Sequence, residues 1–214
     1  MKNILLTYIC LFGLLLPASA QQLDAKTVLD RTADAFRRAG GVEAEFTVQA
    51  SSNGVSEGSS TGVIRLQGRK FMLDSEGVKT WFDGRTQWSY LSGSDEVNIS
   101  EPTADELQSI NPYALLTIYK QGYQIRSGST NAFGGKSIYE VTLTAMDKRQ
   151  DLQSVNLYIA KDTFQPLRVS MQQRGGGNVV IRITSYKSGQ TYHDSFFTFD
   201  RNAYPTAEVI DLRD

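Results

Sequence analysis

The sequence predicts a mainly β (α+β) fold: an incomplete antiparallel β-barrel, or curved half-barrel sheet, with an N-terminal helix and a short helical lid covering the concave face. Most of the chain consists of short segments that alternate apolar and polar residues and are separated by turns of hairpin length. One early segment instead repeats its apolar residues with helical spacing, and one central segment is apolar on all sides. No repeat or linker divides the chain, so we expect one domain.

The first twenty residues predict a cleaved secretory signal. Lys2 supplies the positive start, residues 4–16 the apolar core, and Ala18-Ser19-Ala20 a small-residue cleavage site. We therefore expect a signal over residues 1–20 and a mature chain, beginning at Gln21, that forms the single domain over residues 21–214. No later segment approaches the roughly 18 apolar residues of a membrane span, so no transmembrane segment is expected in the mature chain.

Composition argues against several classes of function. The one cysteine, Cys10, lies inside the signal, so the mature chain is expected to lack disulfides, thiol chemistry and thiolate metal sites. Loss of Lys2 from 22 basic residues leaves 21 against 23 acidic ones, a net charge of −2 with the charges scattered along the chain. This pattern does not favour binding to nucleic acid or to an anionic membrane.

The first elements are a helix and a series of strands. Val28, Leu29, Ala33 and Phe36 recur on one side of residues 23–38, which predicts an amphipathic helix that ends at Gly40-Gly41. Residues 42–50 then read as a strand, and the Ser, Gly and Asn run over residues 51–60 predicts a loop. Two further strands, residues 62–66 and 70–74, are interrupted by a bulge or bend at Gly68.

Residues 78–90 predict a hairpin, because Asp83-Gly84 suits a two-residue type I′ turn. The expected cross-strand pairs are Phe82 with Arg85, Trp81 with Thr86 and Lys79 with Trp88. Alternation then places Trp81, Trp88 and Tyr90 on one broad aromatic face. Such a face either fills a core or meets a ligand.

Residues 101–122 differ from their surroundings. Thr103 and Glu106 have capping-box spacing, and Asn111-Pro112 suits a helix start, which predicts short helices over residues 103–108 and 112–120. Their apolar residues are too many for one buried stripe, so the insertion is expected to plug the concave side of the sheet or to cover it as a lid. A strand is expected before the insertion at residues 96–100. Five more are expected after it, at 137–145, 154–160, 166–173, 178–186 and 195–199.

The sequence offers little for catalysis. Residues 54–58 match the G-x-S-x-G string, with Asp162 or Asp147 and then His193 downstream of Ser56, but the required turn between a strand and a helix is missing. A single histidine cannot build a multi-histidine metal site, and residues 175–177 read as a glycine turn. We therefore expect no enzyme, no metal and no cofactor. A secreted serine hydrolase acting through Ser56 stays as a remote alternative.

The order of these parts resembles the periplasmic outer-membrane lipoprotein carrier family, LolA. The resemblance rests on Phe46-Thr47-Val48-Gln49, Lys70-Phe71, the hairpin Asp83-Gly84-Arg85-Thr86-Gln87-Trp88-Ser89-Tyr90, and Asn111-Pro112 downstream. It covers nearly all of the expected mature chain. What it implies is an incomplete β-barrel closed by helices, whose hydrophobic cavity takes up lipoprotein acyl chains from an inner-membrane release transporter and hands them to an outer-membrane acceptor. We also expect the mature protein to be a periplasmic monomer.

The expected ligand-binding residues of this cavity and lid follow from the resemblance together with the aromatic hairpin. They are Phe71, Leu73, Trp81, Trp88, Tyr90, Leu107, Ile110, Leu115, Leu116 and Ile118. The family places an Arg-Pro pair before the strand that begins at Phe71, and its arginine holds the lid. This chain has no proline there, and the role would pass to Arg69. The alternative function is another periplasmic lipid-binding or envelope-stress sensing protein with the same fold.

Overall fold

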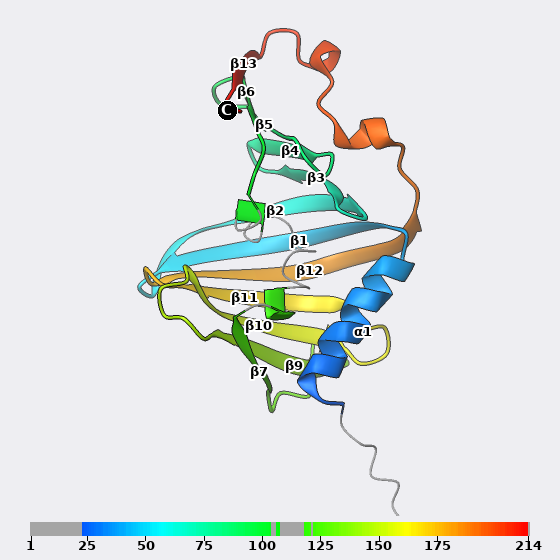
Figure 1. Ribbon diagram of the computed structural model, residues 1–214, viewed down its shortest axis with the longest axis vertical. Helices are drawn as coiled ribbons and strands as arrows, with labels where there is room; N and C mark the ends of the chain where they lie inside the picture. The colour runs from blue at the N-terminus through cyan, green and yellow to red at the C-terminus, as the bar shows by residue number, and fades with distance from the viewer. Residues whose placement is uncertain (1–22, 104–105, 108–117, 121, 214) are drawn as a thin grey trace, which may run out of the picture.

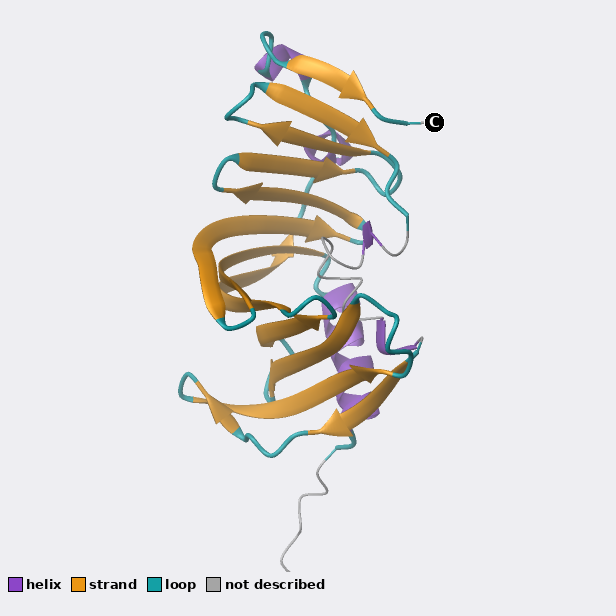
Figure 2. Cartoon of the chain, turned by 90° about the vertical axis from the view of Figure 1, so that its left-hand side faces the viewer, coloured by secondary structure: helices purple, strands orange, loops and turns teal. Residues whose placement is uncertain are grey.

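The computed structural model describes residues 23–103, 106–107, 118–120 and 122–213, which include one 14-residue helix, α1 (Ala25–Arg38), and one 13-stranded sheet. Figure 1 shows α1 lying across the strands of one half of the sheet. The strands are long and strongly curved in that half, and shorter towards β13 (Figure 2). The expected signal over residues 1–20 lies outside the described residues.

The strands follow one another mostly as an antiparallel meander. Their bounds are β1 (Gly41–Ser52), β2 (Val55–Gln67), β3 (Lys70–Ser75), β4 (Val78–Phe82), β5 (Gln87–Leu91), β6 (Glu96–Ser100), β7 (Tyr123–Ser127), β8 (Ala132–Phe133), β9 (Lys136–Ala145), β10 (Leu152–Ala160), β11 (Pro166–Gln173), β12 (Gly177–Gln190) and β13 (Glu208–Asp211). In the described residues the strand order is β13-β6-β5-β4-β3-β2-β1-β12-β11-β10-β9-β7, with β8 beside β9. Only the β13–β6 pair in this order is parallel. The two ends of the order do not pair with each other, which confirms the predicted incomplete barrel.

The helix forms where the sequence predicts it. The Asp24 side chain caps α1 by accepting a 2.9 Å hydrogen bond from the backbone N–H of Thr27. The buried side of α1 carries Val28, Leu29 and Phe36. The helix ends at Arg38, and Gly40 follows with a φ of 71°, a left-handed conformation that glycine adopts without strain.

The predicted loop over residues 51–60 is wrong, because this stretch is the tip of the β1–β2 hairpin. Asn53 and Gly54 form its two-residue turn with φ values of 50° and 82°, as a type I′ turn requires. β1 pairs along its whole length with β2 on one side and β12 on the other. Ser51 and Ser52 are thus paired on both sides, whereas residues 55–60 of β2 pair with β1 alone, because the pairing of β2 with β3 begins at Gly62. This pairing holds the Ser- and Gly-rich residues in an extended conformation that their own propensities do not favour.

The hairpin at Asp83 exists, but its predicted register is wrong by two residues. The observed pairs are Phe82 with Gln87, Trp81 with Trp88 and Lys79 with Tyr90, so the loop has four residues. The Asp83 carboxylate sets the loop length, because it accepts hydrogen bonds from the backbone N–H groups of Arg85 and Thr86 at 2.9 and 2.8 Å. A shift of two residues leaves every side chain on its predicted face, so Trp81, Trp88 and Tyr90 still share one.

The chain after β12 differs from the prediction. Residues 195–199 do not form a strand. The 3-10 helix η2 (Asp194–Phe197) occupies most of them, followed by η3 (Arg201–Ala203) and then β13 at the edge of the sheet. Figure 1 shows this stretch, in orange and red, running from the end of β12 past β3 and β4 to β13. We call residues 191–213 the C-terminal segment.

Candidate functional site

The sheet has two faces, which we name by what covers them. The inner face carries α1, and the outer face carries the C-terminal segment. Two buried clusters lie on the inner face. The first, over β7–β11, packs Val28 and Leu29 of α1 against side chains that include Val141, Leu143, Val155, Leu157 and Val169. The second, over β1–β4, packs Phe36 of α1 against Val42, Ala44, Ile64, Leu66, Phe71 and Phe82.

Between the two clusters the inner face stays apolar but is only half-buried. We call this region the central strip: Phe46, Val48, Val179, Ile181 and Ile183. Phe46 pairs with Ile183 across β1 and β12, and Val48 pairs with Ile181. Val179 and Ile181 pack against the first cluster, whereas Phe46 and Ile183 pack against the second. The strip therefore joins two buried cores into one continuous apolar surface.

Gly62 shapes this surface. It lies on β2 opposite Phe46, and a Cβ placed there would come within 2.6 Å of the Phe46 ring. The ring therefore lies in space that any other residue at position 62 would fill. Glycine here serves close packing of a side chain, not a turn.

The two described ends of the insertion lie on the inner face. Thr103 and Glu106 form the predicted capping box, with the Thr103 N–H donating to Glu106 at 2.8 Å and the Glu106 N–H to the Thr103 hydroxyl at 3.3 Å. Leu107 packs against the β1–β4 cluster, and the buried Ile118 belongs to the β7–β11 cluster. Ile118 begins the 3-10 helix η1 (Ile118–Lys120).

A polar contact ties this end of the insertion to α1. The hydroxyl of Tyr119, in η1, donates a hydrogen bond to the Asp30 carboxylate. Burial raises the pKa of Tyr119 well above its usual value, and the Asp30 charge adds to the shift, so the phenol is neutral at pH 7. Ile110, Leu115 and Leu116, with most of the predicted lid, lie outside the described residues.

The predicted ligand-binding residues do not share one surface. Phe71, Leu73, Leu107 and Ile118 belong to or pack against the inner-face clusters. Trp81, Trp88 and Tyr90 form a cluster with Met72 and the C-terminal segment, on the opposite side of the same strands. The prediction that all of them line one cavity is therefore wrong, because β3 and β4 point alternate side chains to opposite faces.

The outer-face cluster is packed through its rings. The centre of the Trp81 ring lies 5.7 Å from the ring centres of both Phe199 and Tyr204, and the ring centres of Tyr90 and Tyr204 are 4.5 Å apart. Phe197 at its centre is fully buried. Burial, with a hydrogen bond from the Tyr90 hydroxyl to Asp95, raises the pKa of Tyr90. These rings form a small second core, which attaches the C-terminal segment to the outer face of the sheet.

The proposed latch residue lies apart from both clusters. Arg69 is exposed in the two-residue turn between β2 and β3, next to Gly68 with its φ of 61°. Within the described residues Arg69 forms no ion pair or side-chain hydrogen bond. Its role as a latch stays a prediction.

The hydrolase alternative is not supported by the placement of Ser56. Ser56 and Gln67 lie near opposite ends of β2, separated by roughly 35 Å of chain measured along the strand. His193 belongs to the Gln67 end, since the N–H of the neighbouring Tyr192 donates to the Gln67 side chain at 2.9 Å. Ser56 thus has no histidine within reach.

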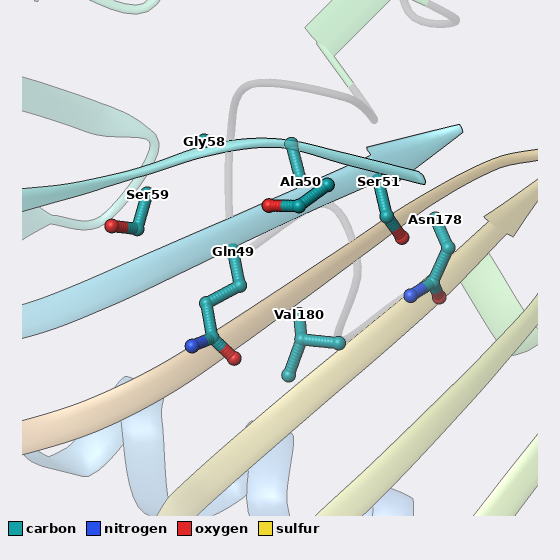
Figure 3. Close-up of a pocket in the computed structure, with 8 residues that line it drawn as sticks. Gln49, Ala50, Ser51, Gly58, Ser59, Asn178 and Val180 are labelled. Atoms are coloured by element: carbon teal, nitrogen blue, oxygen red, sulfur yellow. The ribbon is translucent and has the colours of Figure 1, made fainter. Parts of the chain in front are cut away.

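A pocket does lie beside Ser56, at the tips of β1, β2 and β12 (Figure 3). Its volume is about 410 Å³, and it is lined by Gln49, Ala50, Ser51, Ser56, Gly58, Ser59, Asn178 and Val180. None of these residues is an acid or a base. The pocket therefore supplies hydrogen bonds but no group that could activate a serine.

Two further searches concern metals and membranes. In the described part of the chain, no three His, Cys, Asp or Glu side chains are grouped so that they could hold a metal ion. Among the same residues, no helix combines the length and the apolar character needed to cross a membrane.

Sequence reasoning missed the central strip. The alternation of apolar residues in 42–50 and 178–186 was the available signal, since it places Phe46 and Val48 on one face of β1 and Ile181 and Ile183 on one face of β12. The aromatic residues of the hairpin give a stronger pattern, and they direct attention to the face of β4 and β5 that packs against the C-terminal segment.

Comparison with known proteins identifies related folds and the family of the chain. An uncharacterised conserved protein from Thermus thermophilus matches with a TM-score of 0.61 at 16% identity, over 87% of this chain and 98% of that one. Two other structures score lower. A LolA superfamily protein from Nitrosomonas europaea has a TM-score of 0.45 at 13% identity, over 83% of this chain and 99% of that one. MucB of Pseudomonas aeruginosa in complex with MucA has a TM-score of 0.43 at 16% identity, over 82% of this chain and 61% of that one. Among curated proteins, no sequence matches the chain. The family model described as outer membrane lipoprotein carrier protein LolA matches residues 16–177, and the chain belongs to this family.

Proposed function

We propose that this protein is a periplasmic carrier that holds the acyl chains of lipoproteins against the inner face of its sheet. The observation that supports it most is the central strip, an apolar surface left half-buried between two buried cores. Membership of the LolA family supports the same class of ligand. In this proposal the protein acts by binding and is not an enzyme.

An acyl chain suits the central strip in its chemistry. The five side chains of the strip offer apolar atoms and no hydrogen-bonding group, so they can recognise only shape and apolar area. Each methylene that an acyl chain buries there contributes about 0.8 kcal/mol. Several methylenes give useful affinity, yet no single contact holds the chain irreversibly, as a carrier that must also release its cargo requires.

The proposal includes a route for the cargo. An inner-membrane release transporter would supply the lipoprotein and an outer-membrane acceptor would receive it, as the resemblance implies. The mature protein would begin at Gln21 and act as a monomer in the periplasm. The predicted lid residues Ile110, Leu115 and Leu116 would contact the same acyl chains.

Two neighbouring residues of β12 give a matched test. Ile181 lies in the central strip, whereas Val180 faces outward beside Gln49, and both side chains are half-buried. Ile181→Glu places a charge where the proposed ligand is hydrocarbon, and Val180→Glu places the same charge on the other face. We expect Ile181→Glu to weaken binding of a fluorescent fatty acyl probe at least tenfold, by about 1.4 kcal/mol or more, and Val180→Glu to leave it nearly unchanged.

Two measurements complete the test. Circular dichroism melting of both variants separates lost binding from lost folding, and Ile181→Ser serves if the glutamate variant unfolds. Mass spectrometry of protein purified without detergent identifies the lipid it carries. Equal binding by the two folded variants, together with no co-purified acyl lipid, would sink the proposal.

A further inference from the structure

A second pocket lies beneath the C-terminal half of α1. It has a volume of about 230 Å³ and lies between α1, the turn from β10 to β11, and β12. The residues that line it are Thr32, Ala35, Phe36, Arg38, Ala39, Thr163, Phe164, Gln165, Pro166, Tyr186 and Ser188. Phe36 and Tyr186 also pack in or against the β1–β4 cluster, and Phe164 packs against the β7–β11 cluster. The pocket thus adjoins both cores that the central strip joins.

The lining combines an apolar part with polar groups. Phe36, Phe164 and Pro166 supply rings, while the Tyr186 hydroxyl and the side chains of Thr163 and Ser188 supply hydrogen-bond donors. Burial raises the pKa of Tyr186 to about 12. Its phenol is therefore neutral at pH 7 and can donate a hydrogen bond to an anion.

Tyr186 also connects the pocket to the central strip. Tyr186 pairs with Ala44 and Ile183 with Phe46, so both lie on the inner face of β12, separated by a bulge. A molecule with its polar end in this pocket could therefore extend its apolar end along the strip.

Arg38 provides a cation that has no ion-pair partner among the described residues. It lines the pocket, and none of the eleven lining residues is acidic. The neighbouring Arg37 forms an ion pair with Asp34, whereas Arg38 forms none with the described residues. A guanidinium can accept a carboxylate or a phosphate through two parallel hydrogen bonds.

We propose that this pocket binds the anionic head of an acyl lipid, a carboxylate or a phosphate ester, whose chain lies on the central strip. Arg38 would pair with the anion and the Tyr186 hydroxyl would donate to it. This inference rests on the proposed function and extends it, because it adds anionic amphiphiles to the acyl-chain ligands that the inner face would hold. A structural role for Arg38 is the rival interpretation, since a basic residue in the last turn of a helix stabilises it.

The test uses the mature chain and four probes. Dodecanoate and dodecyl phosphate carry the anion and the chain, dodecanol carries the chain alone, and inorganic phosphate the anion alone. By calorimetry below the micelle concentration, we expect the two anionic amphiphiles to bind roughly tenfold more tightly than dodecanol. Arg38→Gln should remove this preference without changing dodecanol binding, and Tyr186→Phe should reduce it.

Arg37→Gln is the matched control. It removes a basic residue from the same helical turn, costs α1 its pair with Asp34, and leaves the pocket lining unchanged, so it should keep the preference for anions. Equal binding of dodecanoate and dodecanol by the wild type, or equal losses in the two arginine variants, would overturn the inference and leave the proposed function standing. Inorganic phosphate binding as tightly as dodecyl phosphate would overturn it as well. Failure of every alkyl probe to bind would instead count against the proposed function and, with it, this inference.

Discussion

Strands β3 and β4 carry apolar side chains on both faces, and the two faces differ in how those side chains are held. On the inner face Phe71 and Phe82 are buried in the same cluster as Phe36, but Leu73 and the central strip are only half-buried. On the outer face Trp81 lies among the rings of Phe199 and Tyr204. The C-terminal segment of the chain covers the aromatic side chains of the outer face, whereas the inner face retains apolar surface that a ligand can cover.

This difference gives the two faces different tasks. Separating closely packed aromatic rings costs much of their packing free energy, so these rings suit permanent attachment of the C-terminal segment. The apolar side chains of the central strip have part of their surface free, so an acyl chain can cover them without displacing a packed neighbour. The comparison predicts that substitutions on the outer face change stability more than binding, and substitutions on the inner face the reverse.

The largest expected effect is at Phe197. Its side chain is fully buried against Met72 and Trp81, so Phe197→Ala should lower the free energy of unfolding by about 3–5 kcal/mol. Urea denaturation gives this value. Binding of a fatty acyl probe at low urea should stay close to that of the wild type.

Phe196→Ala is the matched control, since Phe196 is 36% exposed and should contribute far less. Tryptophan emission offers a second reading, because Trp81 should become more solvated in the Phe197 variant. If both phenylalanine variants are equally stable, or if only the Phe197 variant loses probe binding, the assignment of the outer face to attachment is wrong.

A medium effect is expected at Gly62 on the inner face. The added Cβ of Gly62→Ala would meet the Phe46 ring and the Asp74 backbone oxygen, so the ring must move away from β2 and change the surface of the central strip. We expect a loss of about 1 kcal/mol in unfolding free energy, at the low end for overpacking, because a ring can shift more easily than backbone. Affinity for a long acyl probe should change by a larger factor than in the Phe197 variant.

Gly58→Ala is no substitute control, since Gly58 has a φ of 127° and would be strained by any side chain. Val63→Ala is better, because Val63 is the next residue of β2, pairs with Glu45 and points to the outer face. A Gly62 variant with unaltered acyl affinity would show that the position of Phe46 does not matter to the ligand.

Much of the fold could be predicted from the sequence because its signals are local. The spacing of Val28, Leu29, Ala33 and Phe36 predicts α1, and alternation predicts most strands of the meander. The capping box at Thr103 and Glu106 is likewise a matter of four consecutive residues, and the structure contains it.

The errors have two causes, an overlooked local signal and the influence of distant residues. Residues 51–60 look like a loop by composition, yet Asn53-Gly54 is a strong hairpin signal, and pairing with β12 extends the strand to the turn. Phe197 and Phe199 alternate as in a strand, but their rings pack under β3 and β4, and the segment coils to reach them.

The candidate site could be predicted only in part because of the influence of distant residues. Alternation separates Trp81 from Phe82 correctly, but both faces of the hairpin are apolar, and nothing local says which of them lies beneath α1. That choice depends on the C-terminal segment, more than a hundred residues later in the chain, which covers Trp81 and Tyr90. Arg38 and Tyr186 meet in one pocket for equally non-local reasons.

The smallest expected effect concerns the polar tie across the inner face. The Asp30 carboxylate accepts hydrogen bonds from Lys26, at 2.7 Å, and from the Tyr119 hydroxyl, and these two contacts lower the pKa of Asp30. Because its side chain is 44% exposed, Asp30→Asn should lower the unfolding free energy by only a few tenths to about 1 kcal/mol at pH 7. Asp34→Asn, which breaks the pair with Arg37 but not the tie to Tyr119, is the control.

The pH dependence of this small effect has a definite sign. A carboxylate whose pKa is lower in the folded chain than in the unfolded chain, where it is about 3.9, stabilises the fold above that value and loses its contribution as the pH falls through the folded pKa. The difference in unfolding free energy between the wild type and Asp30→Asn should therefore be constant near pH 7 and close progressively below about pH 4. Urea denaturation at a series of pH values measures it. A difference that instead grew on acidification would mean that the neutral carboxyl, and not the charged one, holds Tyr119 and the end of the insertion against α1.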